Sequence, residues 1–304
     1  MQFREKVQRQ FKLLQDEICA GLEKLDGVAQ FQEDLWTRSD GNHEDGGGGR
    51  TRILENGNLI EKGGVNFSAV HGELPEAVFK TLGVSSAAFF ACGVSIVLHP
   101  HNPHVPIIHM NVRYFELEDG TYWFGGGIDL TPHFIVPEKA KDFHTKLKNT
   151  CDQFNPDFYS EFKVWADNYF FNEHRNETRG VGGIFYDKLT EEKTGLTKDE
   201  LLDYSIKLGQ TFVPAYAAQD SGRDQSFSDA ERQWQLLRRG RYVEFNLVYD
   251  RGTKFGLQTS GRIESILMSL PKDASWLYNY QPSSDAERFT LANLNKGIDW
   301  LASI

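Results

Sequence analysis

Four histidines fall within the eleven-residue segment HPHNPHVPIIH: His99, His101, His104 and His109. Imidazole nitrogens bind divalent metals and also transfer protons near neutral pH. The prolines exclude a continuous helix here, and the HExxH spacing of helical zinc sites is absent. The segment leaves three interpretations open: a metal site, a proton-transfer histidine, or ordinary polar loop residues.

Two stretches of the chain alternate between polar and apolar residues with the period of a β-strand. In VPIIHMNVRYF, the side chains of His109, Asn111 and Arg113 would share one face, and apolar side chains the other. In GVSIVLH, Ser95 and His99 would share a polar face in the same way. A strand face that only meets water is usually rich in Lys, Glu and Thr. These faces carry His, Asn, Arg and Ser instead, which favours the floor of a cleft.

A third stretch, YVEFNLVYD, also alternates and is expected to form a strand over Tyr242–Tyr249, with Glu244, Asn246 and Asp250 on one face. The glycines of GGGIDLTP, Gly125–Pro132, would let a ligand approach the backbone closely, or they mark a bulge or tight bend.

The elements that would position these residues are strands in the middle of the chain and helices around them. Phe3, Val7, Phe11 and further apolar residues recur every three or four positions, which predicts an N-terminal helix. Short links between the strands favour antiparallel neighbours. We expect an α+β fold in a single domain, residues 1–304, with one broad antiparallel β-sheet flanked by helices on both sides. The predicted strands are Arg50–Leu54, Leu59–Lys62, Ala87–Leu98, Pro106–Leu117, Thr121–Leu130, Tyr242–Tyr249 and Arg262–Leu270; the predicted helices are Glu138–Phe154, Asp157–Phe171, one starting near the capping box of Thr197 and Glu200, and Ser284–Leu301.

Composition and charge exclude several classes of protein. The net charge of −10 argues against a general nucleic-acid binder, so an anionic ligand would need arginines gathered locally. The three cysteines are far apart, which suggests neither a disulfide framework nor a cysteine zinc site. No apolar run is long enough for a membrane span, and the N-terminus lacks the apolar core of a signal peptide. We therefore expect a cytoplasmic protein.

Five long segments together resemble the oxygen-dependent coproporphyrinogen-III oxidase family, and they occur in the order typical of that family. One departure is Ser260, where members often carry a second glycine before Gly261 and Arg262. The segments are GGGGRTRILENGNLIEKGGVNFSAVHG (Gly46–Gly72), HPHNPHVPIIHMNVRYFE (His99–Glu116), WFGGGIDLTP (Trp123–Pro132), HRNETRGVGGIFYD (His174–Asp187) and YVEFNLVYDRGTKFGLQTSGRIESILMSLP (Tyr242–Pro271).

The resemblance implies a reaction: two propionates of coproporphyrinogen III become vinyl groups, giving protoporphyrinogen IX, carbon dioxide and hydrogen peroxide in haem biosynthesis. Dioxygen is the oxidant, and no organic cofactor is expected. By the same resemblance, His109, Asp250 and Asp129 are the catalytic residues. The implied substrate-binding residues are Ser95, Asn111, Val112, Arg113, Ser260, Gly261 and Arg262.

The resemblance also implies assembly and a metal set. His174 and the segment Tyr242–Leu277 match a dimerisation region, so a homodimer is expected. A divalent metal is implied for some members, although we expect the reaction to be largely independent of it. Two alternatives remain: a tetrapyrrole-binding protein without catalysis, and a metal-dependent oxygenase. The implied metal ligands are His99, His109, His144 and His174.

Overall fold

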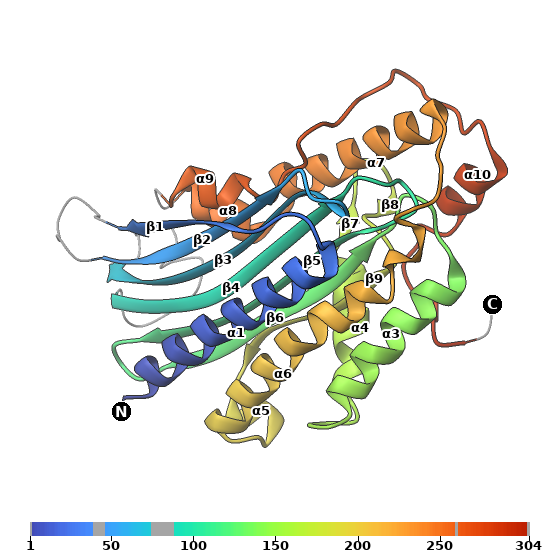
Figure 1. Ribbon diagram of the computed structural model, residues 1–304. Coiled ribbons are helices and arrows are strands. Elements are labelled where there is room, and N and C mark those ends of the chain that lie inside the picture. The colour runs from blue at the N-terminus through green and yellow to red at the C-terminus, as the bar shows by residue number, and fades with distance from the viewer. Residues whose placement is uncertain (1, 39–45, 74–87, 259–260, 303–304) are drawn as a thin grey trace.

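The computed structural model describes residues 2–38, 46–73, 88–258 and 261–302, and its centre is a seven-stranded sheet. All neighbouring strands are antiparallel, in the order β1-β2-β3-β4-β5-β6-β9 (Figure 1). The α+β prediction with one antiparallel sheet is confirmed. The strands of this sheet are β1 Gln32–Thr37, β2 Gly47–Glu55, β3 Ile60–Glu73, β4 Ala88–Pro100, β5 Ile107–Leu117, β6 Tyr122–Thr131 and β9 Gly182–Leu189.

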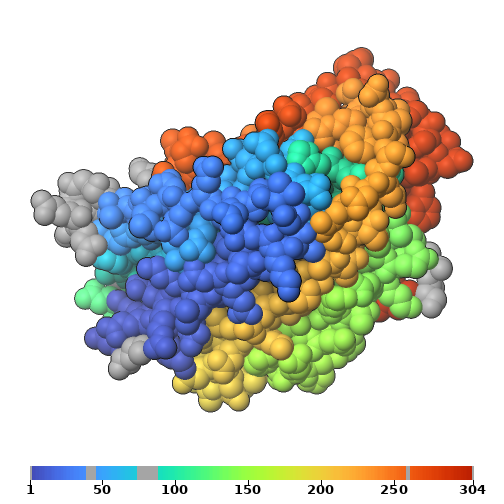
Figure 2. Space-filling view, viewed as in Figure 1, coloured from blue at the N-terminus to red at the C-terminus, as the bar shows by residue number. Residues whose placement is uncertain are grey.

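Helices cover both faces of the sheet. Helices α1 (Phe3–Asp26), α6 (Lys198–Ala217) and α3 (Pro137–Cys151) form a continuous layer over one face (Figure 2). On the opposite face lie α7 (Asp229–Val248), α8 (Arg251–Gln258) and α9 (Ile263–Leu267) (Figure 1). The smaller described elements are α4 Phe158–Tyr169, β7 Phe171–Asn172, β8 Glu177–Thr178, α5 Glu191–Thr194, a 3₁₀ turn at Asp220–Gly222, and α10 Asp285–Ala292.

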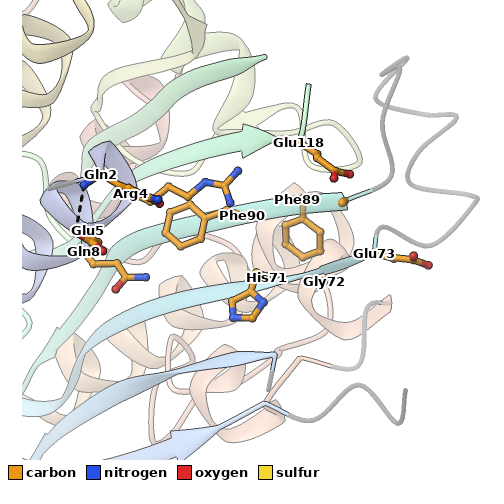
Figure 3. A pocket seen from close by; sticks show the side chains of 11 residues that line it. Gln2, Arg4, Glu5, Gln8, His71, Gly72, Glu73, Phe89, Phe90 and Glu118 are labelled. Atoms are coloured by element: carbon orange, nitrogen blue, oxygen red, sulfur yellow. Dashed lines mark hydrogen bonds between the residues drawn. The ribbon is translucent and has the colours of Figure 1, made fainter. Parts of the chain in front are cut away.

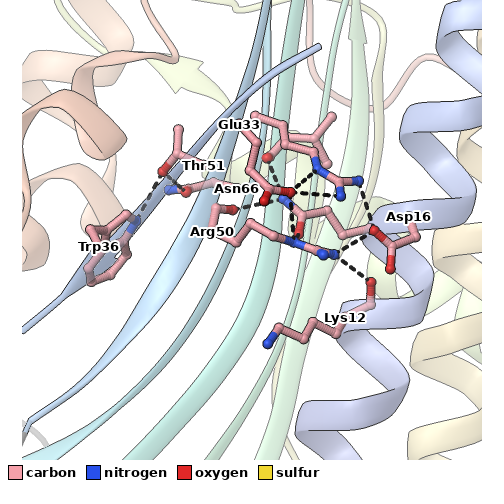
Figure 4. Close-up of polar contacts among 10 residues, drawn as sticks. Lys12, Asp16, Glu33, Trp36, Arg50, Thr51 and Asn66 are labelled. Atoms are coloured by element: carbon pink, nitrogen blue, oxygen red, sulfur yellow. Dashed lines mark hydrogen bonds and ion pairs between the residues drawn. The ribbon is translucent and has the colours of Figure 1, made fainter.

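The N-terminal helix forms as its apolar spacing predicts. Val7, Phe11 and Leu14 of α1 are buried against the sheet, as are Ile18 and Leu22. Arg50 of β2 completes the attachment: its guanidinium donates to the Lys12 carbonyl, 3.0 Å away, and to the Asp16 carboxylate, 2.7 Å away (Figure 4).

The other face of β2 carries a separate polar contact. Thr51 accepts a hydrogen bond from Trp36, lies 2.5 Å from Asn66 of β3, and is 2.7 Å from Ser265 of α9 (Figure 4). These contacts hold α9 against the first three strands, so one strand anchors helices on both sides of the sheet.

Strands β4 and β5 separate their side chains as the alternation predicts, and β6 does the same. Ile96, Met110 and Ile128 point into the core under α1 and α6, and none of them is exposed. The residues between them face the other side, where Ser95 pairs with Asn111 and His109 with Asp129 across the register. A core face and a polar face are therefore both present on the same three strands.

Two predicted strands are wrong. Tyr242–Tyr249 lies in α7 and its C-terminal cap, and Arg262–Leu270 contains α9. The alternation of YVEFNLVYD was misleading because the segment is too short to separate the two periods. It is helical, and its buried side chains, Tyr242, Phe245 and Asn246, recur after three or four residues. The capping box of Ser228 and Glu231 marks the true start of α7.

The remaining predicted helices are confirmed, with different ends. Glu138–Phe154 corresponds to α3, Asp157–Phe171 to α4, and the Thr197 capping box begins α6. The last helix was predicted too long, because α10 ends at Ala292 and turns follow it. In the part of the chain that the structure describes, no helix combines the length and apolar character that crossing a bilayer needs.

Candidate active site

The polar face of the central strands is the floor of a cleft of about 340 Å³. Strand β4 contributes Ser95, and β5 contributes His109, Asn111 and Arg113, as the alternation predicts. The opposite wall comes from α7, α8 and α9, including Asn246, Asp250, Thr253, Ser265 and Ser269.

A second cavity of about 460 Å³ adjoins the first and shares part of its lining, including Asn66, Ser68 and Ser265. Arg262 and Arg38 line only this second part. Both volumes lie in the range of about 300–1,000 Å³ typical of small-molecule sites. The two cavities therefore form one elongated cleft with different chemistry at its two ends.

His109 is held from below by a buried carboxylate. Its Nδ1 lies 2.8 Å from Oδ1 of Asp129, which is almost fully buried. Burial alone raises the pKa of Asp129, but the Arg179 charge and the His109 hydrogen bond lower it, and the net pKa falls below its ordinary value. An ionised carboxylate only accepts hydrogen bonds. Nδ1 of His109 therefore carries the proton and donates a hydrogen bond to Asp129.

The hydrogen bonds on the other side of His109 agree with that tautomer. Arg113 donates to Oδ1 of Asn111 over 3.3 Å, which turns the Asn111 amide nitrogen toward Nε2 of His109, 3.4 Å away. Nε2 is therefore an acceptor that faces the cleft. Arg113 also pairs with Asp187 at 3.1 Å.

Asp250 lies on the opposite wall, at the N-terminus of α8. Its Oδ2 accepts from the Thr253 backbone N–H at 2.6 Å, which makes it the helix cap. Its Oδ1 accepts from the Tyr169 hydroxyl at 2.9 Å. Each oxygen keeps a further lone pair, so Asp250 can still accept a hydrogen bond from a ligand in the cleft.

Arg262 at the far end has spare hydrogen-bonding capacity. Its Nη2 forms an ion pair with Asp34 of β1, whereas its buried Nη1 has no hydrogen-bond partner among the described residues. An unsatisfied buried guanidinium N–H is costly in a folded protein and suits an anionic ligand. Arg38 lies over the Phe89 ring, 5.8 Å from its centroid, and adds a second cation to this end.

A separate hollow of about 900 Å³ lies at the N-terminal end of α1 and the ends of β3 and β4 (Figure 3). It is lined by Gln2, Arg4, Glu5, Phe90 and neighbouring residues. Among the described residues, none that the sequence suggests for catalysis or substrate binding lies there. The elongated cleft is thus the candidate active site.

Comparison with known proteins identifies the family of this chain. The family model described as coproporphyrinogen III oxidase matches residues 6–300. The chain belongs to the coproporphyrinogen III oxidase family. An oxygen-dependent coproporphyrinogen-III oxidase of Prochlorococcus marinus (strain NATL1A) is 48% identical, covering 94% of this chain and 88% of its own. The chloroplastic enzyme of Glycine max is 45% identical, covering 95% and 77%, and coproporphyrinogen-III oxidase 1 of Arabidopsis thaliana is 43% identical, covering 95% and 76%.

The four histidines that the family resemblance implies as metal ligands have four different environments. His99 lies 2.9 Å from the Ser269 carbonyl, and burial lowers its pKa. His144 lies between the Tyr159 hydroxyl and the Val181 carbonyl, and burial lowers its pKa to about 4. His174 contacts Tyr249 and Glu244 outside the cleft, and His109 contacts Asp129.

These placements do not fit a common metal ion. Within the described ranges, no three His, Cys, Asp or Glu side chains are grouped so as to hold one. We therefore derive no step of the reaction through a metal.

The family's implied substrate contacts are mostly in the cleft. Val112 has its side chain in the core, so only its main chain can reach a ligand. Gly261 lines the Arg262 end. Ser260 lies outside the described residues.

Sequence reasoning missed Arg179, Tyr169 and Asn246 as parts of this site. Arg179 was inside a quoted family segment, but no spacing related it to Asp129, since it follows the short strand β8 far along the chain. The helical period of α7 could have found Asn246: Tyr242, Asn246 and Asp250 recur every four residues, whereas Glu244 points elsewhere and binds Arg175.

Proposed function

We propose that this chain oxidatively decarboxylates two propionates of coproporphyrinogen III to vinyl groups, giving protoporphyrinogen IX, carbon dioxide and hydrogen peroxide. The observation that carries the proposal is the different chemistry of the two ends of one cleft. At one end a buried N–H of Arg262 has no hydrogen-bond partner in the described part of the chain, and at the other end His109 faces the wall that carries Asp250. Carboxylates suit the first end, and proton transfer suits the second.

The overall balance of each step defines what the protein must supply. A propionate loses carbon dioxide and the equivalent of a hydride, dioxygen takes up those two electrons, and one proton is added to give hydrogen peroxide. The protein therefore has to hold carboxylates, assist the loss of electrons from the macrocycle, and deliver a proton.

Asp250 is proposed to accept hydrogen bonds from the pyrrole N–H groups. A negative charge there stabilises the positive charge that develops as the electron-rich ring is oxidised. Its fixed position as the cap of α8, with Tyr169 as a second donor, supports this role.

His109 is proposed to transfer the proton. The hydrogen bonds around it leave Nε2 as an acceptor in the resting enzyme, so it takes up a proton from the cleft and then donates it. Arg113 and Arg262 are proposed to bind the propionates, with Ser95, Asn111 and the main chain of Val112 as further contacts.

Dioxygen is the only co-substrate in this proposal, without an organic cofactor. The test is incubation of the purified chain with coproporphyrinogen III in air and under strict anaerobiosis, followed by analysis of porphyrin products and peroxide. We expect conversion only in air. Equal turnover without oxygen or any added oxidant would contradict the proposal, and tight binding without turnover would indicate a tetrapyrrole-binding protein instead.

Thorough chelation tests the remaining alternative. We expect most of the activity to survive, because the four histidines contact different partners. A near-total loss that one particular divalent ion restores would support a metal-dependent oxygenase.

The assembly and compartment are also proposed. A homodimer is supported by exposed apolar side chains in Tyr242–Leu277, since such clusters commonly mark protein interfaces. A cytoplasmic location is supported by Cys19, Cys92 and Cys151, all free and buried, which suits a reducing compartment. The exposed apolar residues of this segment are Leu247, Val248, Phe255, Leu257, Ile263, Trp276 and Leu277.

A further inference from the structure

Arg179 is among the most enclosed charged groups of the described chain, with about 3% of its surface exposed. It follows β8 and reaches the place where β6, the end of α4 and α7 meet. Burying a guanidinium costs free energy unless it is paired and hydrogen-bonded. The contacts that offset this cost indicate the role of Arg179.

The first of these contacts is with Asp129. Nη2 of Arg179 lies 2.7 Å from Oδ1 and 2.8 Å from Oδ2, and Nε lies 3.2 Å from Oδ2. Both carboxylate oxygens are engaged, so Asp129 cannot rotate without losing these hydrogen bonds. Its Oδ1 is the atom that also accepts from His109.

The second group of contacts fixes Arg179 itself. Its guanidinium carbon lies 4.4 Å from the ring centroid of Phe170 and 4.6 Å from those of Tyr242 and Phe245. Nη1 donates to Asn246 over 2.9 Å. Three aromatic faces and a hydrogen bond leave the guanidinium little freedom, because each favours the same position.

These contacts complete a chain of hydrogen bonds whose direction is set by an arginine at each end. Arg113 donates to Asn111, Asn111 to His109, His109 to Asp129, and Arg179 also to Asp129. An arginine cannot accept a hydrogen bond, so neither end can reverse. Nη2 of Arg179 also lies 3.5 Å from Nδ1 of His109, but the contact of Nδ1 with Asp129 is much shorter, at 2.8 Å. Nδ1 therefore donates to Asp129, and the imidazole is restricted to one tautomer.

From this geometry we infer that Arg179 is a positioning residue for the reaction: it fixes Asp129 so that His109 keeps its proton on Nδ1 and presents Nε2 to the cleft. The inference rests on the proposed function. Arg179 lies at the edge of the cleft, and in this role it acts through Asp129 and His109 rather than on the reacting atoms.

The test compares Arg179→Lys with the matched variant Arg238→Lys. Arg238 is equally buried, pairs with Glu177 at 2.9 Å and lies over the Trp234 ring, but it contacts neither His109 nor Asp129. Lysine keeps the charge at either position, and at position 179 it removes the two-pronged contact with Asp129. Folding is checked by circular dichroism and by the thermal midpoint of each variant.

Activity with coproporphyrinogen III in air gives the first measurement. For Arg179→Lys we expect kcat to fall by about tenfold or more with KM nearly unchanged, since a positioned proton-transfer group contributes on the order of 10²-fold or more. Arg238→Lys should keep the parental kcat. An unchanged kcat in a folded Arg179→Lys protein would overturn the inference.

The imidazole nitrogens of His109 give a second measurement that needs no turnover. Nitrogen-15 NMR of histidine-labelled protein, with the His109 signals assigned from their loss in His109→Gln, reports which nitrogen carries the proton. We expect Nδ1–H in the parental protein and in Arg238→Lys, and a mixture of tautomers in Arg179→Lys.

If Arg179 were only structural, Arg179→Lys would lose stability while its remaining folded fraction kept the parental tautomer, and the inference would fail. Absence of activity in the parental protein would instead contradict the proposed function, and the tautomer comparison would still decide the role of Arg179. Should Arg179→Lys not fold, the double variant Arg179→Met/Asp129→Asn, which removes both buried charges together, is compared with Asp129→Asn alone. We expect a more mixed set of His109 tautomers in the double variant, and identical tautomers in the two would overturn the inference.

Discussion

Asp250 combines two tasks that are normally hard to separate by mutation. It caps α8 through Thr253, and it is proposed to hold the pyrrole N–H groups. An asparagine can perform the first task, because its side-chain oxygen accepts the same backbone N–H. It cannot perform the second, because it carries no negative charge.

We therefore predict that Asp250→Asn lowers kcat by about 10²-fold or more and changes KM less. Stability should change by no more than about 1 kcal/mol, because Asn is as good a cap as Asp and the Tyr169 hydroxyl can rotate to accept from the amide. Steady-state kinetics and urea denaturation measure the two effects. A folded variant with the parental turnover would remove Asp250 from the mechanism.

Arg262 should behave in the opposite way. An ion pair to a propionate that does not react is equally strong in the bound substrate and in the transition state, so its loss raises KM and leaves kcat. For Arg262→Gln we expect KM to rise by roughly 10- to 100-fold, the equivalent of one or two charged hydrogen bonds. Arg288→Gln, which removes an exposed arginine of α10, serves as the control. A large fall in kcat with unchanged KM would place Arg262 at the propionate being oxidised.

Because His133 is buried, we expect the free energy of unfolding to depend on pH. Burial, followed by the Arg239 charge, lowers the pKa of His133 to about 3, and its Nδ1 donates to the Pro103 and Val105 carbonyls. In the unfolded chain the pKa returns to about 6.5. Between roughly pH 6 and 4 the unfolded chain binds a proton that the folded chain does not, so the free energy of unfolding falls as pH falls.

His133→Asn keeps a donor for the carbonyls and cannot titrate. In that pH range, we expect the slope of the free energy of unfolding against pH to decrease by about 1.4 kcal/mol per unit. Denaturation at several pH values measures this slope. An unchanged slope in His133→Asn would contradict the prediction.

At the scale of elements, the central strands could be predicted from the sequence, whereas the edge strands β1 and β9 and the helical wall were missed. Alternation predicted the faces of β4 and β5, and with them the neighbourhood of Ser95, His109 and Arg113. Helix α7 was missed because the pattern of Tyr242–Tyr249 also fits the period of a strand, and α9 has only five residues. Arg179 depends on contacts between segments that are distant in sequence, which local patterns do not contain.

The joint between α1 and the hairpin of β2 and β3 depends on one carboxylate. The buried Asp26 accepts backbone N–H groups on both oxygens: Oδ1 from Ala29 and Asn58, and Oδ2 from Leu59 and Ile60. Its pKa is lowered, because these hydrogen bonds outweigh burial, which alone would raise it.

Asp26→Asn must turn an amide NH₂ toward one of these pairs of donors. We predict a loss of about 2 kcal/mol or more in the free energy of unfolding, measured by chemical denaturation, because buried donors are left unsatisfied. Asp152→Asn, which removes an exposed carboxylate beside Lys148, should change it by less than about 0.5 kcal/mol. Equal stability of the two variants would show that the joint does not depend on this charge.

At the scale of the whole molecule, the proposed homodimer makes a prediction about the exposed apolar residues of α7 and α8. We expect Leu247→Glu/Leu257→Glu to shift the protein to a monomer in sedimentation at micromolar concentration, because two buried charges would face an apolar partner. Val164→Glu, at a more exposed apolar position on α4, is the control and should leave the assembly unchanged. A parental protein that sediments as a monomer would contradict the dimer.

The alternation in β4, β5 and β6 has a consequence for how this chain can change in length. On all three strands the odd-numbered residues face the cleft and the even-numbered ones the core: Ser95, His109 and Asp129 on one side, Ile96, Met110 and Ile128 on the other. The strands therefore have a frame of two residues, much as a coding sequence has a frame of three. One inserted residue within β5 would send Met110 to the substrate and His109 into the core, unless a bulge absorbed it. An insertion at the Gly120 turn changes no face, so length differences among working relatives should collect in such turns.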